Sequence, residues 1–325
     1  MRILIVYPAV DGLNNGNLVT AERWQKRLSE LGHSVEVAAS FDDASHDADQ
    51  KIDLMIALHA VKSLPSIKKC SDSNPNCPIV VVLTGTDLYD ANLRETVQQS
   101  LTIADQIVVL QTVTAEDVPE QYREKVNVIY QSVDTVSWAI EKTDKTDEFF
   151  EVCVVGHLRP VKVPLQASWA ARKLPPESKI RVTQIGEALS AAIRTAAEKE
   201  EKENSRYRWI GAVSRDDSMQ RIAASDLLVN SSMVEGGAAV ICEAVVAGTP
   251  ILASRVAGNI GFLGEDYQGL FDVLDTDRLR EMMLSAEKDR DFYQRLKDQC
   301  ESRKHLFEPD FEKRKWAELI EKFES

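Results

Sequence analysis

The fold of this chain is decided by one stretch, which reads Val234-Glu235-Gly236-Gly237-Ala238-Ala239-Val240-Ile241-Cys242-Glu243-Ala244-Val245-Val246-Ala247-Gly248-Thr249-Pro250. Two glycines lead into a helix rich in alanine and valine, Gly248 ends it, and Pro250 prevents its continuation. The apolar run Ile251–Ala253 follows as the next strand. A glycine loop, a buried helix and an apolar strand in this order are typical of a parallel α/β sheet.

The start of this helix predicts a site for an anion. Backbone N–H groups of Gly236, Gly237 and Ala238 point out of the helix N-terminus, where the helix dipole favours phosphate, and glycines let a ligand approach closely. Glu235 precedes the first turn and could hold sugar hydroxyls, whereas Glu243, about two turns on, could take a ribose diol. The alternative is that Glu235 is only a helix-start acid and Glu243 a solvated helix residue.

Composition bounds the class of protein. A length of 325 residues predicts two domains, and 28% charged with 44% hydrophobic residues is ordinary for a soluble protein. The net charge of −13 argues against nucleic acid or an anionic membrane as the main partner. An anionic substrate would therefore need a local positive site.

The remaining composition signals concern location. The five cysteines are scattered without a CxxC pair, which predicts reduced thiols in the cytoplasm and no zinc site, although Cys70 and Cys77 could form a bridge. We find no signal peptide, and no apolar run approaches the roughly 20 residues that span a bilayer. The oligomeric state is left open.

The first half alternates apolar strands with loops and amphipathic segments, beginning with Arg2–Tyr7, a glycine- and asparagine-rich loop, a helix from Thr20 to Leu31, and Ser34–Ala39. This is a βαβ unit. The loop lacks the GxGxxG pattern and no acid ends the second strand, which argues against a nicotinamide dehydrogenase.

Polar residues follow several of these strands at their carboxyl ends, where ligands bind in such sheets. We expect one site lined by Asn15, Gly16, Asn17, His59, Lys62, Ser63, Thr84, Gly85, Thr86 and Asp87. Backbone N–H groups and hydroxyls in these loops could hold a small anion. His59 could instead be a structural histidine, and Thr84–Asp87 only an Asp-capped turn.

A second series of strands begins near Phe149, after a polar linker over residues 139–148. Arg159 and Lys162, in the loop after the first of these strands, are the cations most suited to a diphosphate, although they could be ordinary surface cations. Asp275-Thr276-Asp277 matches a DxD metal motif but precedes a helix and is better explained as its cap. The whole therefore reads as α/β, with two doubly wound Rossmann-like domains facing each other across a cleft.

On these residues the chain resembles a GT-B glycosyltransferase of the GT4 kind over nearly its whole length. The marks are Glu235 and Glu243 beside Gly236-Gly237, the loop Gly156…Arg159…Lys162, and Val128-Ile129-Tyr130-Gln131-Ser132-Val133-Asp134. The resemblance implies an N-terminal acceptor domain at 1–138, joined by a C-terminal helix at 309–325, and a nucleotide-sugar domain at 149–308. It also implies a metal-independent enzyme without a cofactor.

Site roles follow from the same resemblance. Arg159 and Lys162 would clamp the diphosphate, Glu243 would bind the ribose, and Glu235 would contact the donor sugar and act in catalysis with His59 and Thr84. Gly16, Gly236, Gly237 and Ala238 would complete the donor site. The acceptor site would comprise Asn15, Asn17, Lys62, Ser63, Gly85, Thr86 and Asp87.

A narrower resemblance is to the selenosugar synthases of selenoneine biosynthesis. It is carried by Asn15-Gly16-Asn17-Leu18-Val19-Thr20-Ala21, Ala57-Leu58-His59-Ala60, Leu83-Thr84-Gly85-Thr86-Asp87-Leu88-Tyr89, Val154 to Lys162, and Glu235 to Ala238. It implies transfer of a sugar from UDP-GlcNAc or UDP-glucose to selenophosphate, with release of UDP and phosphate. The alternatives are a GT4 enzyme with an ordinary sugar or small-metabolite acceptor, a catalytically silent UDP-sugar-binding protein, or an epimerase of the same fold.

Overall fold

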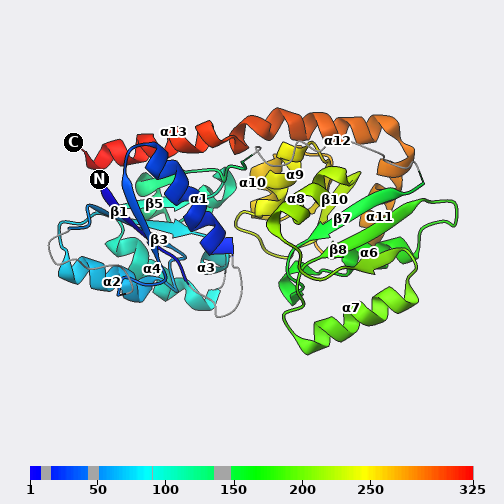
Figure 1. Ribbon diagram of the computed structural model, residues 1–325, viewed down its shortest axis with the longest axis horizontal. Coiled ribbons are helices and arrows are strands. Elements are labelled where there is room, and N and C mark those ends of the chain that lie inside the picture. The colour runs from blue at the N-terminus through cyan, green and yellow to red at the C-terminus, as the bar shows by residue number, and fades with distance from the viewer. Residues whose placement is uncertain (9–15, 43–50, 90, 135–147, 325) are drawn as a thin grey trace. The chain divides into compact units, whose positions relative to one another are not determined.

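The computed structural model describes residues 1–8, 16–42, 51–89, 91–134 and 148–324. The chain divides into two compact units, the first comprising Met1–Ser132 with Leu306–Ser325 and the second Val133–His305. Each unit contains one parallel sheet of six strands, and coiled ribbons lie against the strands of each (Figure 1). The α/β class with two doubly wound sheets is therefore confirmed. Of the expected linker over residues 139–148, only Glu148 lies within the described residues.

The first sheet has the strand order β2-β1-β3-β4-β5-β6, and every neighbouring pair is parallel. Its order reverses between β1 and β3, so the loops after these two strands flank the switch point, where open α/β sheets bind ligands. The strands are β1 Arg2–Val6, β2 Ser34–Ala38, β3 Leu54–Leu58, β4 Ile79–Leu83, β5 Gln106–Val109 and β6 Val126–Val128. The helices are α1 Gly16–Glu30, α2 Leu64–Ser73, α3 Thr86–Tyr89, α4 Arg94–Ile103, α5 Thr112–Asp117 and α13 Pro309–Ile320.

The second sheet has the strand order β12-β11-β10-β7-β8-β9, again parallel throughout. Its switch point lies between β7 and β10. The strands are β7 Phe150–Val155, β8 Ile180–Ile185, β9 Tyr207–Trp209, β10 Leu227–Asn230, β11 Ile251–Ser254 and β12 Leu270–Phe271. The helices are α6 Gln166–Arg172, α7 Ala191–Glu203, α8 Arg215–Ala224, α9 Ala239–Ala247, α10 Ala257–Leu263, α11 Thr276–Lys288 and α12 Arg290–Arg303.

Continuous apolar runs form the strands because both faces of each sheet are covered. Every residue of β3 and β4 is buried, and β10 and β11 are also buried throughout. Gly248, at φ 74°, ends α9 with its amide bonded to the carbonyls of the last turn, as the sequence predicts. The Asp275 side chain accepts from the amide of Arg278 and caps α11, which confirms a helix cap at the DxD pattern.

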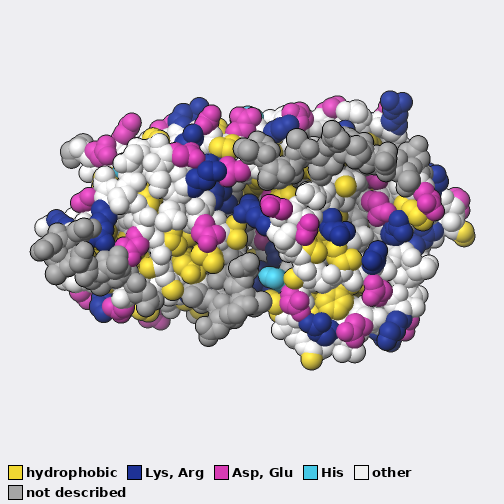
Figure 2. All heavy atoms as spheres, viewed as in Figure 1, with side chains coloured by type: hydrophobic (Ala, Val, Ile, Leu, Met, Phe, Trp, Pro, Cys, Tyr) yellow, Lys and Arg dark blue, Asp and Glu magenta, His cyan; other side chains and the backbone are white. Residues whose placement is uncertain are grey.

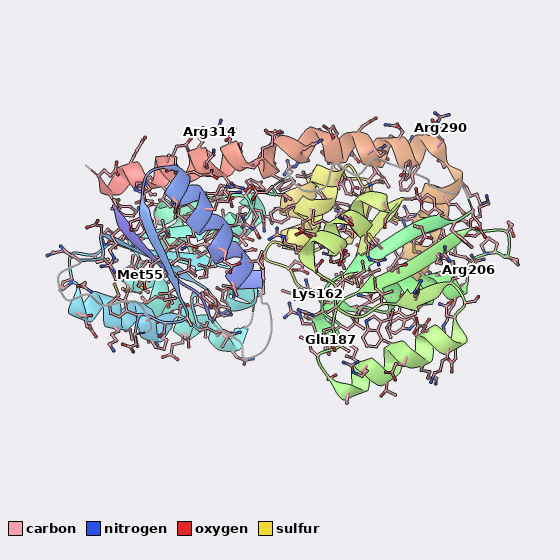
Figure 3. The ribbon with its side chains drawn as sticks, viewed as in Figure 1. Met55, Lys162, Glu187, Arg206, Arg290 and Arg314 are labelled. Carbon is pink, nitrogen blue, oxygen red and sulfur yellow. The ribbon has the colours of Figure 1, made fainter. Side chains whose placement is uncertain are left out.

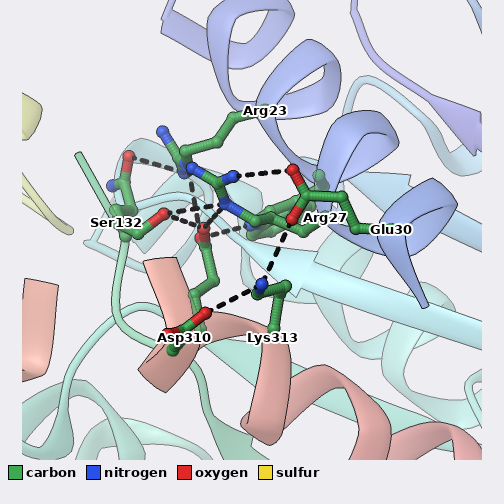
Figure 4. A network of polar contacts seen from close by, with 9 residues as sticks. Arg23, Arg27, Glu30, Ser132, Asp310 and Lys313 are labelled. Carbon is green, nitrogen blue, oxygen red and sulfur yellow. Dashed lines mark hydrogen bonds and ion pairs between the residues drawn. The ribbon is translucent and has the colours of Figure 1, made fainter. Parts of the chain in front are cut away.

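The C-terminal helix α13 is fastened to the first unit by one buried carboxylate, Glu312, which has no exposed surface. Arg23 Nε (3.1 Å) and Trp24 Nε1 (2.7 Å) donate to Glu312 Oε1, and the Ser132 hydroxyl donates to Oε2. Figure 4 shows this network, in which Arg27 also approaches Glu312 at 3.7 Å. These contacts join segments far apart in the sequence, and they place Ser132 and helix α13 in the same structural unit.

Surface charge follows the composition. On the described part of the face in Figure 2, Lys and Arg side chains are interspersed with Asp and Glu, and no broad surface of one sign is seen. In the described segments no helix combines the length and the apolar character that a membrane crossing requires. All five cysteines are buried and none forms a disulfide.

Candidate active site

The loop after β7 places Lys162 at the carboxyl edge of the second sheet. Its backbone forms a short 3-10 helix, Pro160–Lys162, and then turns through Val163 at φ 44°, a left-handed conformation that is uncommon for a β-branched residue. The Ser231 hydroxyl, at the end of β10, donates to the carbonyls of Lys162 (3.1 Å) and Val163 (3.0 Å). The end of β10 is thus bonded to the loop that follows β7, which holds the backbone of Lys162.

Two glycines let the neighbouring loops approach this point. A Cβ atom on Gly186, which has φ 142°, would lie 2.0 Å from the carbonyl oxygen of Gly156. The amide of Leu158 also donates to the carbonyl of Glu187 at 2.8 Å. Figure 3 shows Lys162 and Glu187 near the same end of the second unit, in agreement with this contact. The loops after β7 and β8 therefore pack backbone to backbone.

Glu235 lies against Lys162. The two side chains form an ion pair, and the Ser232 hydroxyl donates to Glu235 Oε1 at 2.6 Å. The side chains of Lys162 and Glu235 are 22% and 10% exposed, so the pair is largely shielded from water. The sequence predicts both residues at the donor site but not their direct contact, because they lie 73 positions apart.

The backbone of Glu235 is held from the other side by α10. The amide of Gly258 donates to the Glu235 carbonyl at 3.1 Å, and a Cβ on Gly258 would lie 2.4 Å from that oxygen. Asn259 and Ser254 continue the support, since Asn259 Nδ2 donates to the Ser254 carbonyl (2.9 Å) and Ser254 donates to that of Ser232. Glu235 is therefore presented on a rigid loop.

Helix α9 begins directly after the glycines. Ala238 is its N-cap, Gly236 is buried, and no described side chain caps this end of the helix. Glu243 lies on the same helix with a side chain 14% exposed, and its Oε1 is 3.6 Å from a guanidinium nitrogen of Arg215 on α8. The sequence does not indicate Arg215 as a site residue, since nothing in its local sequence distinguishes it from a surface cation.

Arg159 is the other expected clamp residue. It is exposed, and among the described residues its side chain has no hydrogen-bond or ion-pair partner. Its carbonyl accepts from the Lys162 amide at 3.0 Å, which places the two residues at the two ends of a single 3-10 turn. A flexible exposed arginine beside a fixed lysine can adjust to a bound phosphate, because the guanidinium offers several donors.

A small pocket opens beside Lys162 at the switch point. It is lined by the ends of three strands and the loops that follow them, namely Val154, Val155, Gly156, Lys162, Pro164, Gln184, Val229, Asn230, Ser231 and Ser232. Gln184 is 1% exposed, and its Oε1 has no hydrogen-bond partner among the described residues. The sequence gives one signal for this residue, since Gln184 continues the alternate positions of Ile180 and Val182, which are buried in the same strand.

Three of the expected residues of the first unit, His59, Thr84 and Gly85, lie against a fourth, the buried carboxylate of Asp87. Asp87 is 1% exposed and accepts from the amides of Ala60 (3.0 Å), Thr84 (3.0 Å) and Gly85 (2.8 Å). The interpretation as an Asp-capped turn is therefore correct in its geometry. It corrects the expectation that the Thr84 and Gly85 amides are available to hold an anion, because both donate to Asp87.

His59 lies within the same cluster, in the loop after β3. It adopts φ 71°, is 4% exposed, and has its Nδ1 3.8 Å from Asp87 Oδ2 and 3.4 Å from the donating amide of Lys62. Burial lowers the pKa of His59, and Asp87 opposes that shift only in part. His59 is thus a neutral imidazole at neutral pH, in a backbone conformation that glycine adopts more readily.

The remaining expected acceptor residues differ in their settings. Ser63 is buried and its hydroxyl donates to the Leu58 carbonyl at 2.6 Å, whereas Lys62 is exposed. Gly16 and Asn17 form the first residues of α1, and Thr20 donates to the Gly16 carbonyl at 2.9 Å. Asn15 and the side chain of Thr86 lie outside the described residues. No cluster of three or more His, Cys, Asp or Glu side chains that could hold a metal ion is found in the described part of the chain.

Known structures share the fold of the whole chain. A structure from Anabaena, titled Alr3699/HepE in complex with UDP and glucose, matches with a TM-score of 0.74 at 16% identity, covering 99% of this chain and 100% of that one. Sucrose-phosphate synthase from Thermosynechococcus elongatus matches with a TM-score of 0.80 at 14% identity, covering 99% and 98%. A glycosyltransferase from Rickettsia africae matches with a TM-score of 0.76 at 13% identity, again covering 99% and 98%.

Two parallel six-stranded sheets with switch-point loops, matched over their full length by these structures, define the GT-B class of fold. The model of the family described as Glycosyl transferases group 1 matches residues 138–303, just over half of the chain. The chain belongs to this glycosyltransferase family, which confirms the expected GT-B fold and GT4 kind.

Proposed function

We propose that this chain transfers a sugar from a UDP-sugar to a small acceptor. The observation that carries the proposal is the placement of Lys162 and Glu235 in direct contact at the switch point of the second sheet, beside the start of α9. A cation and a carboxylate at such a helix N-terminus suit a ligand that combines a diphosphate with sugar hydroxyls. The second unit would therefore bind the donor and the first unit the acceptor.

In this proposal the donor residues stabilise the leaving group. The bond between the anomeric carbon and the diphosphate breaks, and the acceptor forms a new bond to that carbon. UDP leaves with the electron pair, and the proton of an acceptor hydroxyl passes to an oxygen of the leaving diphosphate. Lys162, Arg159 and the N–H groups of Gly236, Gly237 and Ala238 would neutralise the charge that develops on the diphosphate. Glu235 would accept hydrogen bonds from the sugar, and Glu243, oriented by Arg215, would take the ribose diol.

The donor is proposed from the similar structures. Structures of the Anabaena protein are titled as complexes with UDP, with UDP and glucose, and with UDP-glucose. UDP-glucose is therefore the first donor to test, beside UDP-GlcNAc.

The first unit favours a hydroxyl of a sugar or small metabolite as the acceptor. An anionic acceptor needs free amides or cations, but the amides of Thr84 and Gly85 already donate to the Asp87 carboxylate. Because Nδ1 of the neutral His59 accepts from the Lys62 amide, its Nε2–H could donate a hydrogen bond to an acceptor hydroxyl, with Thr84 and Asn17 as further contacts. Asp87 and Ser63 would act on the acceptor through the loops that they hold in place.

Selenophosphate is the second candidate acceptor, supported by the sequence resemblance and by the exposed cation Lys62. Its selenium would attack the anomeric carbon, and hydrolysis of the selenium–phosphorus bond would then release phosphate and leave a 1-selenosugar. Among the similar structures named above, no title mentions selenium.

Mass spectrometry tests both acceptors. The protein is incubated with UDP-glucose or UDP-GlcNAc and, in separate reactions, with a panel of sugars, selenophosphate, thiophosphate or no acceptor. We expect UDP together with a glycosylated product. A selenosugar would establish the second candidate, and conversion of the donor without an acceptor would indicate hydrolysis or epimerisation. UDP binding without turnover on any acceptor would contradict the proposal and indicate a silent binding protein.

A further inference from the structure

Two anions can form an ion pair with Lys162 in the proposed donor site. One is the diphosphate of the nucleotide, and the other is the Glu235 carboxylate of the chain itself, which already forms an ion pair with it. We propose that Glu235 competes with the diphosphate for Lys162, so that the site selects a sugar nucleotide over the free nucleoside diphosphate. This inference rests on the proposed function and goes beyond it.

The pair is built into the backbone on both sides. Lys162 follows a 3-10 turn that Ser231 bonds to the end of β10. The Gly258 amide donates to the Glu235 carbonyl, and this close approach is possible because Gly258 has no side chain. These contacts hold both backbones at positions where the two side chains meet in the absence of a ligand. A pair with exposures of 22% and 10% is also less screened by salt than one on an open surface.

One oxygen of the Glu235 carboxylate, Oε1, binds other side chains of the protein. Both hydrogen bonds that it accepts, from Lys162 and from Ser232, fall on Oε1. Within the described part of the chain, Oε2 accepts no hydrogen bond. Oε2 is therefore the atom that can take a sugar hydroxyl while Ser232 keeps the carboxylate in place.

The sugar and the diphosphate then bind cooperatively. A free nucleoside diphosphate brings negative charge towards Lys162 and meets Glu235, which competes for the ammonium group and repels the phosphates. A sugar nucleotide also supplies hydroxyl donors to Glu235, which compensate for the weakened ion pair. Glu235 thus penalises UDP more than UDP-sugar, and the same preference helps UDP to leave after transfer.

The variant Glu235→Gln tests this preference because it removes the charge and keeps an oxygen for Ser232. Calorimetry would give the Kd of UDP and of UDP-glucose without acceptor, for the wild type and the variant. We expect the Kd of UDP to be lower in the variant by a factor of about three or more, because the competing ion pair is lost. UDP-glucose should bind no more tightly than before, so the preference for the sugar nucleotide over UDP should fall.

The matched control is Glu187→Gln. Glu187 lies in the adjoining loop after β8, carries the same charge, and pairs with Arg194 instead of Lys162. This variant should leave both dissociation constants unchanged, which separates competition at Lys162 from a general change in charge. Ser232→Ala is a second test with the carboxylate intact, and its loosened Glu235 should give a smaller shift in the same direction.

The outcomes are distinct. If the wild type binds UDP but Glu235→Gln and Ser232→Ala bind it equally or more weakly, the competition is overturned and the proposed function is unaffected. If both ligands gain affinity equally in Glu235→Gln, the carboxylate only repels phosphate and the sugar preference is overturned. If the wild type binds neither UDP nor UDP-glucose, the proposed function and this inference both fail.

Discussion

Asp87 in the first unit and Glu235 in the second both follow the carboxyl end of a parallel strand, and both carboxylates are at most 10% exposed. Their partners differ. Asp87 accepts from three backbone amides, whereas Glu235 contacts a lysine and a serine side chain. Backbone amides cannot leave without unfolding the loops, but a lysine side chain can turn towards a ligand. A buried carboxylate in a strand-end loop can therefore stabilise structure or participate in binding, and its partners distinguish the two roles.

We expect the largest effect from a substitution of Asp87, the carboxylate that stabilises its loop. Asp87→Ala removes the acceptor of three backbone amides, two of them in buried hydrogen bonds, so we expect the free energy of unfolding to fall by about 3 kcal/mol or more. Urea unfolding measures this change, with Asp72→Ala, at an exposed position of the first unit, as the control. Glu235→Ala should cost clearly less stability than Asp87→Ala. Equal losses would contradict the distinction that we draw between the two carboxylates.

The second prediction concerns Lys162, which forms an ion pair with Glu235. Lys162→Ala should raise the Kd of UDP roughly tenfold or more, because it removes a largely shielded cation from the proposed diphosphate site. Its control is Lys173→Ala in the same unit, whose side chain is 65% exposed and pairs with Asp277. Arg159→Ala should weaken UDP binding less, since the exposed arginine is screened by water. An unchanged Kd in Lys162→Ala would remove Lys162 from the donor site.

These two residues also show what could be predicted from the sequence. The strands were predictable because buried parallel strands are continuous apolar runs, and the strand-end positions of Lys162 and Asp87 followed from them. The helix stop at Gly248 followed from local backbone chemistry. These features depend on neighbours in the sequence, which a pattern along the chain contains.

The partners of the site residues could not be predicted in the same way. The contacts between Lys162 and Glu235 and between Arg215 and Glu243 join different loops and helices, so they depend on strand order and helix packing. The Asp87 contacts are closer in sequence, but an aspartate after a strand suits a ligand and a turn equally well. Side-chain identity therefore indicated candidate sites, whereas the tertiary fold decided which contacts form.

The third prediction concerns Gly258, whose amide donates to the Glu235 carbonyl. Gly258→Ala places a Cβ 2.4 Å from the Glu235 carbonyl oxygen, so the loop or α10 must shift. We expect a loss of about 1–3 kcal/mol in unfolding free energy, as overpacking typically costs. Sugar transfer should fall further than the stability loss explains, because the shift moves Glu235 away from Lys162 and Ser232. Ala257→Ser, which adds an atom at the neighbouring position, is the control and should retain transfer activity.

The smallest expected effect concerns His59, which lies beside Asp87. Burial lowers its pKa below the ordinary value of 6.5, so between 6.5 and the lower folded value the unfolded chain binds a proton that the folded chain does not. His59 therefore makes folding less favourable as the pH falls through this window. The unfolding free energy of the wild type should decline below pH 6.5 more steeply than that of His59→Gln, whereas the exposed His305→Gln should follow the wild type. Because His33 titrates in every variant, the difference between the slopes isolates His59. Parallel slopes for the wild type and His59→Gln would mean that Asp87 compensates fully for the burial of the imidazole.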